Sequence, residues 1–215
     1  MTPSNIAGMA MVKGLDVIAV TDHNSCKNCE AVMKAAKTYP LLVIAGMELT
    51  TVEEVHVLCL FSKLEAALAF DRYVYEHLTV FPNQEEIFGR QLRMNEKDEI
   101  LGVEPNLLIQ STTIGFEQVY GLMEKFHGVM VPAHINKNSH SVLSNLGFIP
   151  LGSQFSSVEV SDMKAEEGLK RKNPYLQGCR FLCNSDAHYL GDLHEPVWFL
   201  EVEEQSAEAV LRSLL

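Results

Sequence analysis

Two short runs near opposite ends of the chain combine an acidic residue with a histidine. Asp22 and His23 are adjacent in the first run, and Asp186 and His188 lie close together in the second. Each run follows an apolar stretch that is typical of a buried parallel strand. Parallel sheets and barrels carry out chemistry where such strands end, and imidazole and carboxylate groups bind divalent transition metals. The two runs therefore predict a metal site at the C-terminal edge of a parallel sheet or barrel.

Three further apolar runs carry a histidine or a glutamate. Glu48 and His134 each come directly after such a run, and His56 lies inside a third. A single histidine of this kind is more often a packed or exposed residue than a ligand, but repetition at several strands favours a shared site. The residues at or beside these predicted strand ends are Asp22, His23, Glu48, His56, His134, Asp186 and His188.

The strands that would hold these side chains alternate with helices along the chain. Such alternation is typical of a parallel α/β fold, although spacing alone does not distinguish a barrel from an open sheet. The expected strands are 15–21, 41–46, 55–61, 129–133, 157–160, 180–183 and 197–201. The expected helices are 3–13, 28–38, 63–77, 116–127, 140–146 and 206–214, with a helix or loop over 163–176.

We expect residues 1–215 to form a single domain, because 47% of them are hydrophobic and this suits one sizeable core. The segment 81–113 interrupts the alternation of strands and helices. Within it, residues 91–103 predict a hairpin with a polar turn. Such an insertion beside the site is either a lid or, equally well, a surface hairpin or a dimer contact.

Composition limits the environment and the partners of the chain. The net charge of −11 disfavours nonspecific binding to nucleic acid, but it does not exclude an anionic substrate, because bound cations invert the local field. No apolar run approaches the ~20 residues of a membrane span. Met1 leads directly into a polar helix cap, which predicts no signal peptide. The odd count of five cysteines indicates reduced thiols and a cytoplasmic location.

Several other features carry two interpretations each. Cys26 and Cys29 form a C-x-x-C run, which is either a redox or zinc-binding pair or the first turns of a helix with Cys29 packed inward. The basic run 170–172 is either a phosphate-docking patch or, more simply, a solvated turn.

Three polar residues near the strand-end cluster are candidates for substrate contact. They are Asn24, Lys137 and His140. Lys137 and His140 follow His134, and they would meet a substrate phosphate if their loop folds over the site.

The ordered motifs resemble the PHP family, the polymerase and histidinol phosphatase superfamily of metal-dependent phosphoesterases. The resemblance rests on the TDHN, GMEL, VHVLCLF, PAH and NSDAH runs and covers most of the chain. It implies a distorted (β/α)7 barrel with up to three manganese, iron or zinc ions. Glu48 would bridge two ions, because its two oxygens can serve one ion each, and His56 and His134 would complete one of them.

The resemblance also implies roles for the two acid–histidine runs. His23 and His188 would bind a third ion, and Asp186 would bind the ion that a His-x-His motif normally completes. Asp22 would orient His23 or bind directly. The expected catalytic residues are thus Asp22, His23, Glu48 and Asp186, and the expected metal ligands are His23, Glu48, His56, His134, Asp186 and His188.

One departure from the family pattern concerns the start of the chain. Family members open with a strand that ends in His-x-His, and no such motif precedes His23. Thr2 and Pro3 instead form a good N-cap and first-turn pair for a helix. Either the sequence begins late or the protein lacks that strand, and an open sheet edge would then invite pairing with another chain and a homo-oligomer.

The expected function is hydrolysis of a small phosphorylated metabolite or nucleotide by metal-activated water. One alternative is an exonuclease on short oligonucleotides, although an acidic chain is poorly suited to tracking a nucleic-acid backbone. A second alternative is a catalytically impaired metal-binding or regulatory protein. No membrane partner is expected.

Overall fold

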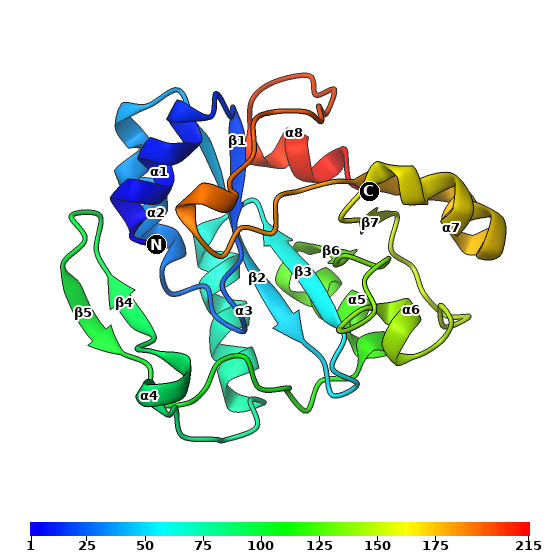
Figure 1. Ribbon diagram of the computed structural model, residues 1–215, viewed down its shortest axis with the longest axis horizontal. Coiled ribbons are helices and arrows are strands. Elements are labelled where there is room, and N and C mark those ends of the chain that lie inside the picture. Colours follow the sequence, from blue (N-terminus) through cyan, green and yellow to red (C-terminus); the bar gives the residue numbers. More distant parts are fainter.

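A four-stranded mixed sheet forms the centre of the computed structural model, which describes residues 1–215 (Figure 1). Its strands are β1 (Val17–Val20), β2 (Leu42–Thr50), β3 (His56–Phe61) and β6 (Gly128–Pro132), in the order β1-β2-β3-β6. β1 and β2 are parallel, whereas β3 is antiparallel to both β2 and β6. Because β3 is reversed, its first residue lies at the edge where the other three strands end. We call this the C-terminal edge.

Four helices cover one face of this sheet. They are α1 (Pro3–Val12), α2 (Cys29–Ala35), α3 (Leu64–Glu76) and α5 (Phe116–Phe126). Their apolar side chains join the alternate residues of β2 and β3 that point to this face, and together they form the main core. This arrangement follows from the period of two along a strand, which sends successive side chains to opposite faces.

The other face is covered by the C-terminal helix α8 (Ala207–Arg212). Val210 and Leu211 pack there with Ile44 and Leu58 in a smaller apolar cluster. Glu48 lies four residues after Ile44, so its side chain points to this same face of β2. The sheet therefore presents its candidate ligands on the side of the smaller cluster.

The expected (β/α)7 barrel is not closed in the structure. Beyond β6, the strands β7 (Ser157–Glu159) and β8 (Arg180–Leu182) form a separate parallel pair. One backbone–backbone hydrogen bond, from Ile135 N–H to the Glu159 carbonyl, joins this pair to the segment after β6. The predicted strand 197–201 is wrong, because this segment has no regular structure. β1 pairs only with β2, so no neighbouring strand satisfies the backbone groups of 197–201.

A two-stranded hairpin of β4 (Leu92–Met94) and β5 (Ile100–Val103) projects beside α1 and α2 (Figure 1). Met94 N–H donates to Oδ1 of Asn28, and the Asn28 amide donates to the Leu92 carbonyl, at 3.0 and 3.1 Å. An isolated hairpin is marginally stable, and these bonds attach it to the loop that follows β1.

Short helices complete the chain. α4 (Glu85–Phe88) precedes the hairpin, α6 (Val142–Asn145) follows β6, and α7 (Glu166–Lys172) follows β7. Single 3₁₀ turns occur at Ala36–Thr38, Met163–Ala165, Pro174–Gly178 and Leu190–Asp192. The basic run 170–172 forms the last turn of α7, where Lys170 pairs with Glu166. None of the helices combines the length and the apolar character needed to cross a lipid bilayer.

Candidate metal centre

The carboxylate of Glu48 lies in the middle of three histidines. Its Oε1 is 3.1 Å from Nδ1 of His56 and 3.4 Å from Nε2 of His134, and its Oε2 is 3.2 Å from Nδ1 of His23. Burial alone would raise the pKa of Glu48, but hydrogen bonds with His134 and His56 and the nearby imidazoles hold it well below its usual range. Glu48 is therefore an ionised carboxylate inside the protein.

Strand pairing explains how this cluster forms. His56 pairs with Thr50, so its side chain is diagonal to Glu48 on the same face of the antiparallel pair. His23 forms an isolated parallel bridge with Glu48 directly after β1. His134 follows β6 by two residues, at the same edge of the sheet. Four segments that are distant in sequence thus place their side chains at one point.

Three ring nitrogens in this cluster are buried without a hydrogen bond. They are Nε2 of His56, Nδ1 of His134 and Nδ1 of His23, which lies near Glu48 but is not aligned for a bond. A buried polar atom left unpaired costs about 1–3 kcal/mol, so each one requires an explanation. His23, Glu48 and His56 offer ligand atoms within 4.8 Å of one another, and imidazole with carboxylate fits a divalent transition metal.

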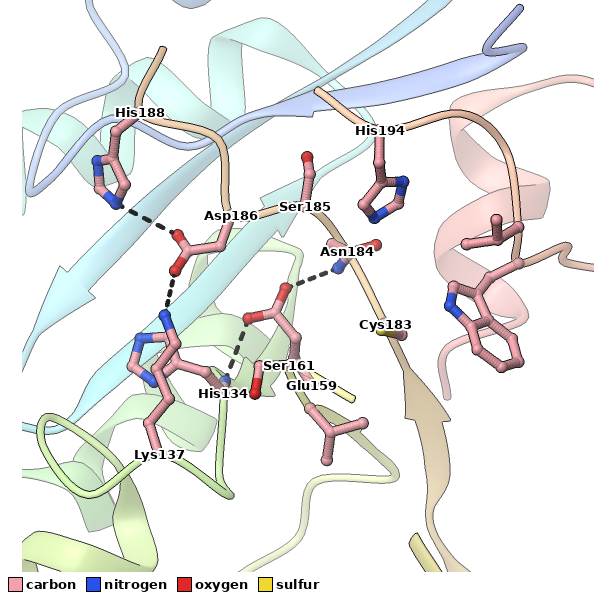
Figure 2. Close-up of a pocket in the computed structure, with 13 residues that line it drawn as sticks. His134, Lys137, Glu159, Ser161, Cys183, Asn184, Ser185, Asp186, His188 and His194 are labelled. Carbon is pink, nitrogen blue, oxygen red and sulfur yellow. Dashed lines mark hydrogen bonds and ion pairs between the residues drawn. The ribbon is translucent and has the colours of Figure 1, made fainter. Parts of the chain in front are cut away.

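Figure 2 shows a second group of polar side chains, which lies next to His134 of the first group. Oδ2 of Asp186 is 2.6 Å from Nζ of Lys137, and Oδ1 is 3.6 Å from Nε2 of His188. The rings of His188 and His23 are stacked 6.0 Å apart, which connects the two groups. A cavity of about 410 Å³ opens here, lined by His134, Lys137, Glu159, Val160, Ser161, Cys183, Asn184, Ser185, Asp186, His188, His194, Val197 and Trp198.

Two residues of the loop after β1 have partners that were not expected. The exposed carboxylate of Asp22 accepts from the Asn28 amide at 3.1 Å. The amide of the buried Asn24 donates to the carbonyls of Leu108 and Gln110, and its oxygen accepts from Thr50 N–H. These bonds connect the Asn24 side chain to β2 and to the segment 107–110, and the expected substrate contact of Asn24 stays a prediction.

His140 reaches the site through His56. Its backbone carbonyl accepts the His56 N–H at 2.9 Å, and the two rings are stacked 4.6 Å apart. The exposed ring of His140 also bonds to the Glu54 carbonyl through Nδ1. His140 therefore packs against a candidate ligand, while Lys137 extends into the cavity.

The backbone is strained at several of these residues. Asn24, His134, His140 and Asp186 have positive φ angles of 48°, 31°, 54° and 47°. Each such residue costs on the order of 1–3 kcal/mol, and strain of this kind is concentrated at functional sites. The strain at His134 and Asp186 is consistent with backbone geometry selected to aim their side chains.

Sequence reasoning missed Glu159 and Asn184. The carboxylate of Glu159 accepts from His134 N–H at 3.1 Å and from the Asn184 amide at 2.7 Å. Burial raises the pKa of Glu159. The available signal was a lone carboxylate between Val158 and Val160, inside an otherwise apolar strand.

The C-x-x-C run lies behind the site, in the core. The thiols of Cys26 and Cys29 are buried and both lie within hydrogen-bond distance of the Gly46 carbonyl, at 3.1 and 3.4 Å. The hydrogen bond with Cys29, together with burial, raises the pKa of Cys26 well above its usual range. This packing is that of inert core thiols, since reactive cysteines are exposed and ionise easily.

Solved structures share this fold. The lesion-specific endonuclease PfuEndoQ from Pyrococcus furiosus matches with a TM-score of 0.66 and 16% identity, over 100% of this chain and 51% of that chain. Endonuclease Q in complex with a 27-mer duplex substrate carrying an abasic lesion at the active site matches with a TM-score of 0.63 and 16% identity, over 99% and 51%. A "putative metal-dependent phosphoesterase" from Bifidobacterium adolescentis matches with a TM-score of 0.60 and 13% identity, over 98% and 91%.

The chain thus spans about half the length of the endonuclease. No protein-family model and no curated protein sequence matches it. The structural neighbours are of the PHP type, which confirms at the level of the fold the resemblance indicated by the sequence motifs. The chain has a mixed α/β fold of the PHP type.

Proposed function

We propose that this chain is a metal-dependent phosphoesterase whose ions are held at the C-terminal edge of the sheet. The observation that carries the proposal is the Glu48 carboxylate surrounded by three imidazoles with unpaired, buried ring nitrogens. His23, Glu48, His56 and His134 would hold the metal of this group, and Asp186 and His188 would hold metal in the adjoining one. Manganese, iron and zinc all suit this donor set, and the family resemblance implies up to three ions.

Divalent ions in such a site polarise phosphoryl oxygens and lower the pKa of bound water toward ~7. The protein side chains would then position the substrate. Nζ of Lys137 lies at the cavity and would contact a phosphate, with Asp186 releasing it when the phosphate or an ion arrives. The cavity of about 410 Å³ is suited to a small phosphorylated metabolite or a nucleotide.

A nuclease is the second candidate function. It is favoured by the likeness to Endonuclease Q, which was crystallised with duplex DNA. The net charge of −11 and the small cavity favour the small substrate instead. The two sheets β1-β2-β3-β6 and β7-β8 would correspond to a distorted barrel that is open between β8 and β1. The free thiols of the five cysteines support a cytoplasmic location.

The decisive test combines metal analysis with hydrolysis. Protein purified without chelator is analysed by mass spectrometry for manganese, iron and zinc, and is assayed on p-nitrophenyl phosphate, bis-p-nitrophenyl phosphate and a short labelled oligonucleotide. His56→Ala should lose metal and activity, whereas His127→Asn should not, because His127 is exposed and far from the site and Asn tolerates its positive φ. Protein that takes up no metal even in excess would contradict the proposal.

A further inference from the structure

Glu159 joins three parts of the candidate site. It is the last residue of β7, and only 3% of it is exposed. Its carboxylate lies between the segment that follows β6 and the segment that follows β8 (Figure 2). One of these segments carries His134, and the other carries Asp186 and His188.

On the β6 side, Glu159 holds the strained backbone at His134. Oε2 accepts the His134 N–H at 3.1 Å, and the Glu159 carbonyl accepts the next N–H, that of Ile135, at 2.8 Å. His134 has a φ of 31°, which a residue with a Cβ atom adopts only when its surroundings enforce it. The two bonds supply that enforcement, and they fix the direction in which the His134 ring meets Glu48.

On the β8 side, Glu159 fixes the start of the run 184–188. Oε1 accepts from the Asn184 amide at 2.7 Å, and Val160 N–H donates to the Leu182 carbonyl at 2.8 Å. Asn184 lies two residues before Asp186, which has a φ of 47°. The bond between Asn184 and Glu159 therefore fixes the position of the Asp186 carboxylate.

Both oxygens of Glu159 therefore accept hydrogen bonds from protein donors. Its partners are neutral, and a buried carboxylate without a cation is costly unless positive charge lies close by. A cation at the neighbouring cluster would compensate the charge.

We propose that Glu159 is a positioning residue that fixes the relative placement of His134 and the run 184–188, and so sets the affinity of the centre for metal. The inference rests on the proposed function. Residues that orient metal ligands in this way typically contribute 10–100-fold to metal affinity.

The test exchanges the polarity of one hydrogen bond. As a reference, Asn184→Ala removes the donor to Oε1 of Glu159. Glu159→Gln alone is a weaker test, because the Asn184 amide can rotate and present its oxygen to the new amide donor. In the double variant Glu159→Gln with Asn184→Asp, the new amide donates to the new carboxylate and its oxygen accepts from His134 N–H. The net charge of the pair is unchanged. Affinity for Mn²⁺ and Zn²⁺ is measured by competition with a chromophoric chelator, and the unfolding temperature of the metal-free proteins is measured in parallel.

We expect Asn184→Ala to weaken metal binding by roughly 10–100-fold, and the double variant, in which the bond re-forms with reversed polarity, to keep most of the wild-type affinity. The Co²⁺ absorption spectrum should be altered in Asn184→Ala and restored in the double variant. Asn184→Ala should fold, because Asn184 is exposed and the change removes only the contact to the run 184–188.

Wild-type affinity in Asn184→Ala would overturn the inference alone. A loss of binding that the double variant does not recover would also overturn it, since it would make Glu159 a ligand or a purely structural residue. Absence of metal from the wild-type protein would instead overturn the proposed function and the inference together.

Discussion

At the scale of the residue, the central feature is the ionised carboxylate of Glu48 in a buried position. It is 5% exposed and its neighbours are imidazoles, each of which can present a neutral nitrogen to an ion. Burial lowers the pKa of His23, which favours the neutral, metal-binding form of its ring. The Glu48 carboxylate would thus offset part of the charge of a divalent ion held beside the three rings.

Glu48→Gln should reduce metal content more than His56→Ala does. The amide removes the only negative charge in contact with the three rings, whereas loss of one imidazole leaves that charge in place. Metal content is measured on protein purified under identical conditions, with His127→Asn as the control. Equal metal content in Glu48→Gln and the wild-type protein would remove Glu48 from the centre.

Lys137→Met should affect substrate more than the fold. The Lys137 side chain is 41% exposed and its pair with Asp186 is at the cavity, so loss of the pair should change stability little. Loss of a charged hydrogen bond to phosphate is worth about 1.5–3 kcal/mol, which lowers kcat/KM by roughly 10–100-fold. Steady-state kinetics on the best substrate checks this. A kcat/KM equal to that of Lys170→Met, a lysine on α7 paired with Glu166, would contradict it.

At the scale of the element, the loop after β1 connects the site to the segment 81–113. Asn24 bonds to Leu108 and Gln110, Asn28 bonds to β4, and Lys27 pairs with the buried Glu104 at 2.9 Å. The hairpin is thereby attached to the loop that carries His23. That the hairpin acts as a lid stays a prediction. If it does, these contacts to the loop after β1 would have to break when the hairpin moves.

Asn24→Ala should destabilise the protein more than Asn24→Gly. Both variants lose the same hydrogen bonds, whose removal costs about 1–3 kcal/mol. Alanine adds the cost of a φ of 48°, about 1–2 kcal/mol, which glycine avoids. Chemical denaturation of the metal-free proteins measures the difference. If the alanine variant proved as stable as the glycine variant, the left-handed conformation of this loop would be disproved.

At the scale of the whole molecule, the acidic net charge and the metal centre are linked. A chain of charge −11 repels anionic substrates from most of its surface, and bound cations would reverse that potential locally. The group around Glu48 has four candidate ligands, namely His23, Glu48, His56 and His134. Asp186, in contrast, is paired with Lys137 and has one histidine, His188, near it. We therefore expect the Glu48 group to fill first.

Removal of metal should lower the stability of the whole protein. Ligands that bind only the native state stabilise it by about 2.7 kcal/mol at a concentration 100 times the dissociation constant. The unfolding temperature should fall after dialysis against chelator and return when Mn²⁺ or Zn²⁺ is added. In Glu48→Gln the same treatment should cause a much smaller shift, and a shift of equal size there would place the ion elsewhere.

The sequence by itself determined which side chains could form a site, because Glu48 and His134 follow apolar runs whose ends must meet at one edge of a sheet. It also predicted most of the strands and helices of the central sheet, since their apolar periods are local properties. It did not determine that β3 is reversed, and only that reversal brings His56 to the same edge as Glu48. The strand predicted over 197–201 failed because a strand needs a paired neighbour, which local pattern does not reveal.

Tertiary structure alone decided the roles of Asn24 and Glu159. Asn24 is adjacent to His23 in the sequence, and only the fold shows that its amide donates to carbonyls more than 80 residues away. Glu159 lies between two valines in a short strand, and no neighbouring residue in the sequence indicates its partners. Its contacts to His134 and Asn184 each span 25 residues. Hydrogen bonds between distant segments depend on how the strands are placed in space, and that placement cannot be read from the spacing of residues in the sequence.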